Sequence, residues 1–272
     1  MSQTISVPIT DNVSDTLFIP LYMRSLETRR SAPVISDPLA CELVECIDYD
    51  FTKYEKSSRS QLGTAIRIRC FDQAISDFVA AHDDPVVVSL GAGLDTRFQR
   101  VHKGKGVFYE LDLPEVIEFR RQLIPESEKN PYIAMSMFDT AWIGEIRERH
   151  PDASFILVAE GVFMYFDEAQ IKPLIVEIAE GFGQGGLHFD VSSPWAVRNS
   201  HRHDTVKKSK AVFKWGLEDD REIQNWSQNL RYTGTTRYFE HEKWRWGMMG
   251  VMGRVLPPLK NAFRMLHYEF TS

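Results

Sequence analysis

Cysteine pairs, long apolar runs and an excess of basic residues are all absent from this sequence. Its 272 residues include three cysteines with no C-x-x-C spacing, so we expect neither a disulfide framework nor a thiolate zinc site. No stretch approaches ~18 uninterrupted apolar residues, the length that crosses a bilayer. The formal charge is -6, from 32 Lys and Arg against 38 Asp and Glu, which disfavours nucleic acid and anionic membranes as partners.

What remains is the composition of an ordinary globular protein, with 43% hydrophobic and 26% charged residues. A chain of this length buries roughly three quarters of its unfolded surface, so it needs neither a disulfide nor a metal to hold a core. Residues 1–15 are polar and lack the basic start and apolar centre of a secretory signal, which predicts a cytoplasmic location.

The hydrophobic pattern divides the chain into a helical segment (1–84), a core (85–192), a cap predicted to be helical (193–260) and a returning strand (261–272). In the core, short β-rich runs alternate with helix candidates. This alternation predicts a parallel sheet covered on both faces. The helix candidates begin near Pro114, Ala141 and Asp167, and the expected strands are 86–90, 106–111, 131–135, 155–159, 186–190 and 263–270.

The sharpest local signal is a glycine turn after the first core strand. Gly91 and Gly93 follow an apolar run, as in the first βα turn of a doubly wound fold. The second strand ends at Asp112, 21 positions beyond Gly91, where an acidic side chain meets ribose hydroxyls. Asp112 also fits as the N-cap of the helix that begins near Pro114. Residue 96 is threonine and the chain has no P-loop motif, so we expect a nucleoside ligand rather than a dinucleotide.

Carboxylates gather where the predicted strands end. Asp95 follows the glycine turn, Asp112 ends the second strand, and Glu160 ends the fourth. Because an acid is rarely buried in an apolar strand end without a partner, Glu160 favours a role in a site over a structural salt bridge. Such carboxylates repel pyrophosphate and attract a cationic ligand. S-adenosylmethionine, with its sulfonium and ammonium groups, is a nucleoside of this kind.

The residues that carry these signals resemble the leucine carboxyl methyltransferase family, which includes polyketide carboxyl O-methyltransferases of the tetracenomycin type. The matching stretches are RIRCFD (67–72), LGAGLDTR (90–97), YELDLP (109–114) and AEGVFMYF (159–166). The resemblance covers about residues 67–190, in order and at the expected spacing. Together with the pattern, it implies an α/β, Rossmann-like, doubly wound and mostly parallel seven-stranded sheet, with an N-terminal helical lead-in and a helical cap inserted before the last strand.

The resemblance also implies which residues bind S-adenosylmethionine and its product S-adenosylhomocysteine. Arg67 would pair with the methionine carboxylate, Asp112 with the ribose hydroxyls, and Glu160 would lie near the methionine end. The adenine would lie near Ser136 and Met137. Family members often have an acid at the adenine position, so Asp139 is an alternative contact. The expected cofactor-binding residues are Arg67, Gly91, Ala92, Gly93, Asp112, Leu113, Ser136, Met137 and Glu160. On its helix, Arg69 is expected to face elsewhere than Arg67.

The expected acceptor is the carboxylate of a small molecule, as the family suggests. A carboxylate with a pKa near 4 is ionised at neutral pH, so no general base is required. Tyr165 and Arg198 are the candidates to orient it, and the cationic stretch from Arg198 to Lys210 suits an anionic substrate. His201 and His203 favour a solvated face over a metal site, and no metal is expected.

Other functions remain open at this point. A protein C-terminal carboxylate is an alternative acceptor, and a sensor or scaffold that binds S-adenosylmethionine without catalysis is an alternative class. The missing third glycine disfavours an NAD-dependent dehydrogenase. The cap aromatics fit packing between helices better than a pocket lining, and the sequence does not decide the oligomeric state.

Overall fold

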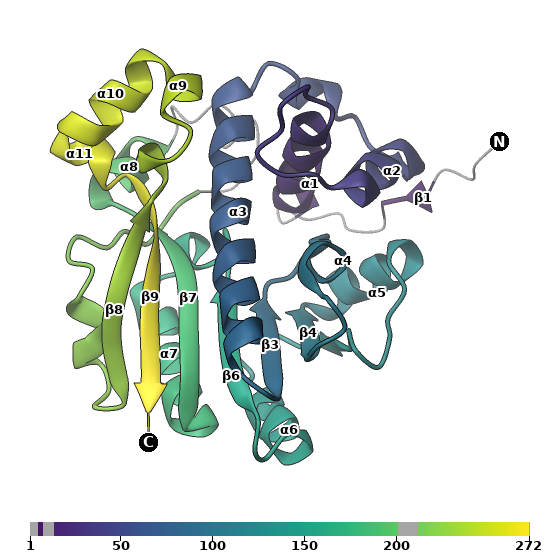
Figure 1. Ribbon diagram of the computed structural model, residues 1–272, viewed down its shortest axis with the longest axis vertical. Coiled ribbons are helices and arrows are strands. Elements are labelled where there is room, and N and C mark those ends of the chain that lie inside the picture. The colour runs from purple at the N-terminus through teal and green to yellow at the C-terminus, as the bar shows by residue number, and fades with distance from the viewer. Residues whose placement is uncertain (1–4, 8–13, 201–211, 272) are drawn as a thin grey trace.

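A seven-stranded sheet forms the centre of the molecule (Figure 1). The computed structural model describes residues 5–7, 14–200 and 212–271. The strand order is β5-β4-β3-β6-β7-β9-β8; the first five are parallel, β9 is antiparallel to β7, and β8 is antiparallel to β9. The strands are β3 (Pro85–Leu90), β4 (Val107–Asp112), β5 (Tyr132–Ala134), β6 (Ser154–Ala159), β7 (Gln184–Ser192), β8 (Leu230–Arg237) and β9 (Phe263–Thr271). The predicted mostly parallel α/β sheet is confirmed.

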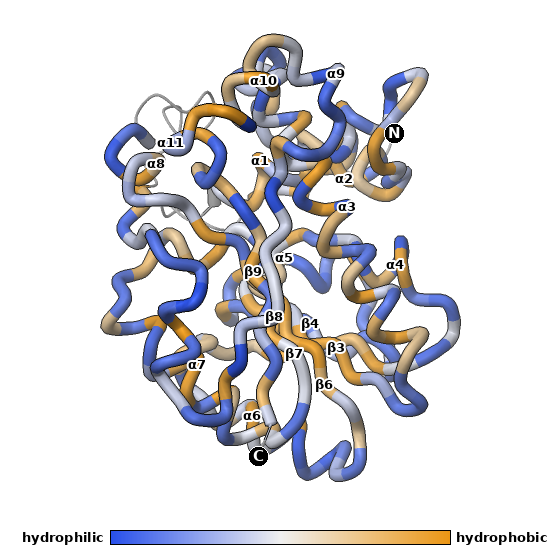
Figure 2. The backbone as a smooth tube through the Cα atoms, turned by 60° about the vertical axis from the view of Figure 1, so that its left-hand side comes forward, coloured by the Kyte–Doolittle hydropathy of each residue, from blue (hydrophilic) through white to orange (hydrophobic). Residues whose placement is uncertain are grey.

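Helices cover both faces of the sheet, and the alternation of strand side chains decides which helix each residue meets. Val86 and Val88 pack in the same cluster as the helices α6 and α7, whereas Val87 packs against the long helix α3 on the other face. Every residue of β3 is therefore buried. Figure 2 shows the hydrophobic strands β3 and β6 in the middle of the molecule. These helices are α3 (Ser58–Ala81), α4 (Arg97–Val101), α5 (Pro114–Leu123), α6 (Ala141–Arg149) and α7 (Glu168–Phe182).

The N-terminal segment folds over one end of the sheet. Its helices α1 (Ser14–Thr28) and α2 (Pro38–Cys46) share an apolar cluster with α5. The expectation of helix alone in this segment was incomplete. Ile5–Ser6 (β1) and Ile47–Asp48 (β2) form a small parallel pair, which is too short to produce a periodic pattern in the sequence.

The cap region was predicted to be helical, and this was wrong for residues 230–237. Strand β8 lies there and forms the sheet edge against β9. The pairing register shifts between Tyr232 and Gly234, so the strand does not keep the strict apolar–polar alternation by which strands are recognised. The helices of this region are α8 (Pro194–Arg198), α9 (Lys243–Trp246), α10 (Met248–Val255) and α11 (Pro257–Lys260), with 3-10 turns at Glu222–Asn225 and Tyr238–Glu240. Two further 3-10 turns lie earlier in the chain, at Thr52–Tyr54 and Phe163–Tyr165.

Candidate active site

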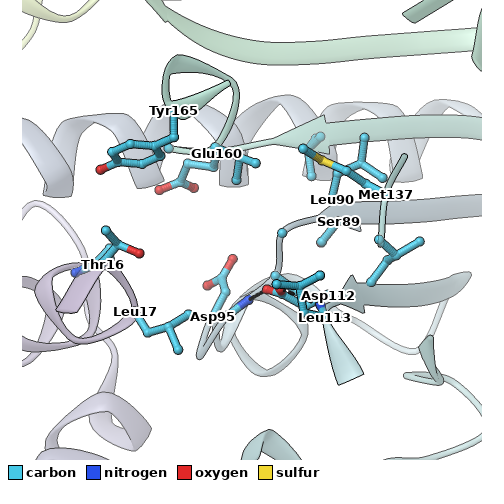
Figure 3. Close-up of a pocket in the computed structure, with 18 of the residues that line it drawn as sticks. Thr16, Leu17, Ser89, Leu90, Asp95, Asp112, Leu113, Met137, Glu160 and Tyr165 are labelled. Carbon is cyan, nitrogen blue, oxygen red and sulfur yellow. Dashed lines mark hydrogen bonds between the residues drawn. The ribbon is translucent and has the colours of Figure 1, made fainter. Parts of the chain in front are cut away.

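A cavity of about 500 Å³ opens at the carboxyl ends of β3, β4 and β6, between the sheet and helix α1 (Figure 3). Parallel α/β sheets bind ligands at this edge. Figure 3 shows Asp112, Leu113 and Met137 at one end of the cavity and Tyr165 and Thr16 at the other, with Glu160 and Asp95 between them. All nine expected cofactor-binding residues line this one cavity: Arg67, Gly91, Ala92, Gly93, Asp112, Leu113, Ser136, Met137 and Glu160.

The glycine turn forms a wall of the cavity and leaves no room for side chains. Gly91 and Gly93 have φ angles of 65° and 51°, in the left-handed region that favours glycine. A Cβ atom on Gly91 would lie 2.6 Å from Cγ2 of Val162, and one on Gly93 would lie 2.9 Å from Cδ2 of Leu17. The turn is therefore packed between the loop after β6 and helix α1, with its backbone toward the cavity.

Backbone groups hold the Asp112 carboxylate in place. The Gly93 amide donates to Oδ2 at 2.7 Å, and the Leu113 amide donates to Oδ1 at 2.8 Å. Burial raises the pKa of this carboxyl to about 6. Leu113, not Asp112, occupies the N-cap position of α5, so the expected capping role was wrong. Each carboxylate oxygen keeps further acceptor capacity toward the cavity, which is the capacity that two ribose hydroxyls require.

The loop after β5 supplies the wall near Asp112. Ser136, Met137 and Phe138 line the cavity. Asp139 is exposed and is not among the lining residues, so the structure brings the expected pair, and not its alternative, to the cavity. Met137 is buried and its carbonyl accepts a hydrogen bond from the indole of Trp142, which fixes this loop against α6.

Glu160 lies at the end of β6 between two arginines. Arg67 Nε donates to Glu160 Oε1 at 2.9 Å, and Arg97 binds the other oxygen. A second nitrogen of Arg67 lies 3.4 Å from Asp190, whose other oxygen accepts the Gly161 amide at 2.6 Å. Burial raises the pKa of Asp190 to about 6. Glu160 is thus both an ion-pair partner and a lining residue of the cavity.

A connected ion network surrounds this end of the cavity. It contains four arginines and five carboxylates: Arg24, Arg67, Arg97, Arg100, Asp37, Asp72, Asp95, Glu160 and Asp190. The strand-end carboxylates are therefore mostly neutralised by arginines. The sequence does not reveal this pairing, because most of the partners lie far apart along the chain. When all members are ionised, the network keeps one excess negative charge. S-adenosylmethionine carries two positive groups and one negative group, so its net charge matches that excess.

Arg67 and Arg69 separate as expected, because Arg69 points away from the cavity and donates to Glu242 at 2.7 Å. Of the two candidates for orienting the acceptor, Tyr165 lines the cavity and Arg198, at the end of α8, is not among the lining residues. The other cap cations and the His-x-His pair, within 201–210, lie outside the described residues. In the part of the chain that the structure describes, no group of three or more His, Cys, Asp or Glu is arranged to hold a metal ion.

Sequence reasoning missed two contributions to the cavity. Helix α1 places Thr16, Leu17, Pro20 and Arg24 along it, although the N-terminal segment was given no role in a site. Lys214, which follows the cap helix α8, also lines the cavity, and its backbone amide donates to the carbonyl of Met164, the neighbour of Tyr165, at 2.8 Å. No motif marks these residues, because only the folding of distant segments brings them to the sheet edge.

Comparison with known proteins agrees with this geometry. The leucine carboxyl methyltransferase family matches residues 18–179. The tetracenomycin polyketide synthesis O-methyltransferase TcmP of Streptomyces glaucescens is 29% identical over 99% of this chain and 100% of its own. A putative S-adenosyl-L-methionine-dependent methyltransferase of Mycolicibacterium gilvum is 30% identical over 76% of each chain.

Solved structures show the same fold at low identity. A DUF574 family protein of Streptomyces avermitilis is 11% identical and superposes with a TM-score of 0.59 over 94% of this chain and 97% of its own. Magnesium protoporphyrin IX methyltransferase of Synechocystis, solved with bound S-adenosylhomocysteine, gives 0.50 at 9% identity over 81% and 92%. The family match covers more than half of the sequence. The chain belongs to the leucine carboxyl methyltransferase family, and it is an S-adenosylmethionine-dependent methyltransferase.

Proposed function

We propose that this enzyme methylates a carboxylate of a small molecule and that it does so without a general base. When bound, S-adenosylmethionine supplies a methyl group that its sulfonium already activates. The protein then has to hold the acceptor oxygen in line with that methyl group and to exclude water. The residues of the cavity have the chemistry for both tasks.

The observation that carries the proposal is that Lys214 lines the same cavity as Tyr165, with its backbone hydrogen-bonded to the adjacent Met164. Among the described lining residues, the arginines all belong to the ion network, whereas Lys214 does not. Its nearest acid is Asp167, 3.5 Å away, and both side chains are about half exposed. Such an exposed ion pair contributes little to stability, so the lysine can leave Asp167 for another anion at little cost. Lys214 is therefore available to bind an anionic acceptor in the cavity.

Tyr165 favours an acceptor that is already ionised. Burial raises the pKa of its phenol to about 12, so the hydroxyl is protonated at neutral pH and acts as a hydrogen-bond donor rather than a base. The described lining of the cavity contains no histidine. A carboxylate needs no proton removed before it attacks, whereas a phenol does.

The remaining residues would hold the cofactor. Asp112 would accept the ribose hydroxyls. Arg67 would pair with the methionine carboxylate, and Glu160 would face the ammonium. The apolar side chains of Leu17 and Val162, which pack on the glycine turn, would keep water from the reacting atoms.

Two likenesses support the choice of acceptor. The family bears the name of a carboxyl methyltransferase, and the relative that matches almost end to end is named for tetracenomycin polyketide synthesis. A small-molecule carboxylate is the acceptor class consistent with both names.

Methyl transfer from radiolabelled S-adenosylmethionine to matched aromatic acids and phenols tests the proposal. We expect labelled products from the acids that alkali hydrolyses, as esters do. In Lys214→Gln, KM for the acid should rise at least about fivefold, as expected for losing one charge-assisted contact, with S-adenosylhomocysteine affinity unchanged. The surface variant Lys103→Gln is the matched control. Alkali-stable products, or labelling of peptide C-termini alone, would overturn the proposal.

A further inference from the structure

Helix α10 is amphipathic in the reverse of the usual sense. Its inward face consists of the buried Gly250 and Gly253. A Cβ atom on Gly250 would lie 2.6 Å from Cβ of Trp246, and one on Gly253 would lie 2.5 Å from Cγ of Phe239. The helix backbone therefore packs directly on these two residues. In a typical surface helix the large apolar side chains face inward, but here they face outward.

The outward side chains form one continuous stripe. Met248, Val251, Met252 and Val255 follow the i, i+3, i+4, i+7 spacing of a single helix face and are 43–79% exposed, and Trp244 beside them is 97% exposed. Six of the eight exposed large apolar residues in the described chain belong to this α10 patch: Trp244, Met248, Val251, Met252, Val255 and Leu256. Contiguous exposed apolar patches of this kind mark interaction sites.

The charges within the stretch that carries the α10 patch are all positive, although Glu240 and Glu242 directly precede it and Glu242 pairs with Arg69. Residues 243–262 contain no Asp or Glu, in a chain whose net charge is -6. Arg245 pairs with Glu27, but Lys243, Arg254 and Lys260 have no ion-pair partner among the described residues. In a symmetric dimer built on this face, the same surface of both copies would meet and these cations would repel one another. The charges favour an anionic occupant over a second copy.

The position of the region leaves it open to contact with an extended surface. Figure 1 shows α9, α10 and α11 at the upper left extremity, at the end of the molecule where the parallel strands have their carboxyl ends. The α10 patch on these helices is exposed, and Trp with Lys is a typical pairing at the membrane–water interface. Within 5–7, 14–200 and 212–271, no helix is long and apolar enough to cross a bilayer.

We propose that the α10 patch docks this protein on an anionic membrane surface. Trp244, Met248 and Val255 insert among the lipid headgroups and upper acyl chains, while Lys243 and Lys260 bind the headgroup phosphates. The cavity lies at the same end of the molecule as the α10 patch. Docking would therefore turn the carboxyl ends of the parallel strands, where the cavity opens, toward the lipid. Net charge predicts no membrane partner, but the local charge of this region has the opposite sign.

Co-sedimentation of the full chain with lipid vesicles tests the docking. We expect binding to vesicles of phosphatidylcholine and phosphatidylglycerol in equal parts, little binding to phosphatidylcholine alone, and weakening by salt. Neutralising two lysines in Lys243→Gln/Lys260→Gln should lower the partition coefficient about 30-fold. The control Lys56→Gln/Lys103→Gln, with the same change in net charge on other exposed surfaces, should bind like the wild type.

The apolar contribution is tested by Met248→Ser/Val255→Ser, which should lower the partition coefficient roughly tenfold. Both side chains are exposed, so S-adenosylhomocysteine affinity should not change and serves as the check of folding. Equal losses in the lysine control would overturn the proposal, because the binding would then be non-specific. Absence of vesicle binding, together with a dimer that becomes monomeric in Met248→Ser/Val255→Ser, would assign the patch to a second copy instead.

Discussion

Alanine at position 91 should destabilise the protein through two separable effects. The φ of 65° at Gly91 costs an alanine about 1–2 kcal/mol. The added methyl would also lie 2.6 Å and 3.1 Å from the two Cγ atoms of Val162, an overpacking that costs about 1–3 kcal/mol. We therefore expect Gly91→Ala to lower the free energy of unfolding by about 2–5 kcal/mol, which most proteins of this size survive.

A double-mutant cycle in urea separates the two effects. Val162→Ala removes both Cγ atoms and leaves Cβ at 3.5 Å, an ordinary contact. The pair should therefore couple favourably by about 1–3 kcal/mol. Gly104→Ala is the matched control, since the φ of Gly104 is also positive but no atom lies within 4 Å of an added Cβ. This variant should therefore lose only the part of the unfolding free energy that comes from the strained φ. Additive effects of Gly91→Ala and Val162→Ala would refute the packing of the glycine turn described above.

Three further outcomes follow from individual contacts. Asp112→Asn replaces one of two acceptor oxygens by an NH₂ group that faces a backbone amide, so S-adenosylhomocysteine affinity measured by calorimetry should fall at least about tenfold. An unchanged affinity would contradict the role of Asp112 in binding the ribose hydroxyls. Burial, with the nearby His267, lowers the pKa of His188 to about 3, so the unfolded state binds more protons than the folded state below pH 6.5. The free energy of unfolding from urea titrations should therefore fall by about 2 kcal/mol between pH 8 and pH 5 because of this residue. His188→Gln should reduce that slope, and an unchanged slope in this variant would contradict the buried neutral pair. Gly144→Ala, on the exposed face of α6 with nothing within 4 Å, should raise stability by about 0.5–1 kcal/mol in the same assay, and a loss would mean that the helix is packed there.

Local sequence signals predicted the core of the cavity well because each depends on near neighbours along the chain. The positive φ of Gly91 and Gly93 follows from a sharp strand-to-helix turn, and Asp112 ends the next strand of the sheet. Strands whose carboxyl ends share one edge bring such residues together without further information. The missed strand β8 shows the opposite case, since its register shift hides the alternation and only pairing with β9 defines it.

The sequence by itself determined the type of sheet, its parallel core and the identity of the turn and acid that face the cavity. Tertiary structure alone decided which carboxylates meet which arginines: Arg97 reaches Asp72 and Glu160 across 25 and 63 positions. It also brought Leu17 and Lys214, from distant parts of the chain, to one cavity, and it turned the apolar face of α10 outward. Hydrophobic period and turn chemistry act over a few residues, whereas ion pairing and exposure depend on how distant segments pack, which no local pattern encodes.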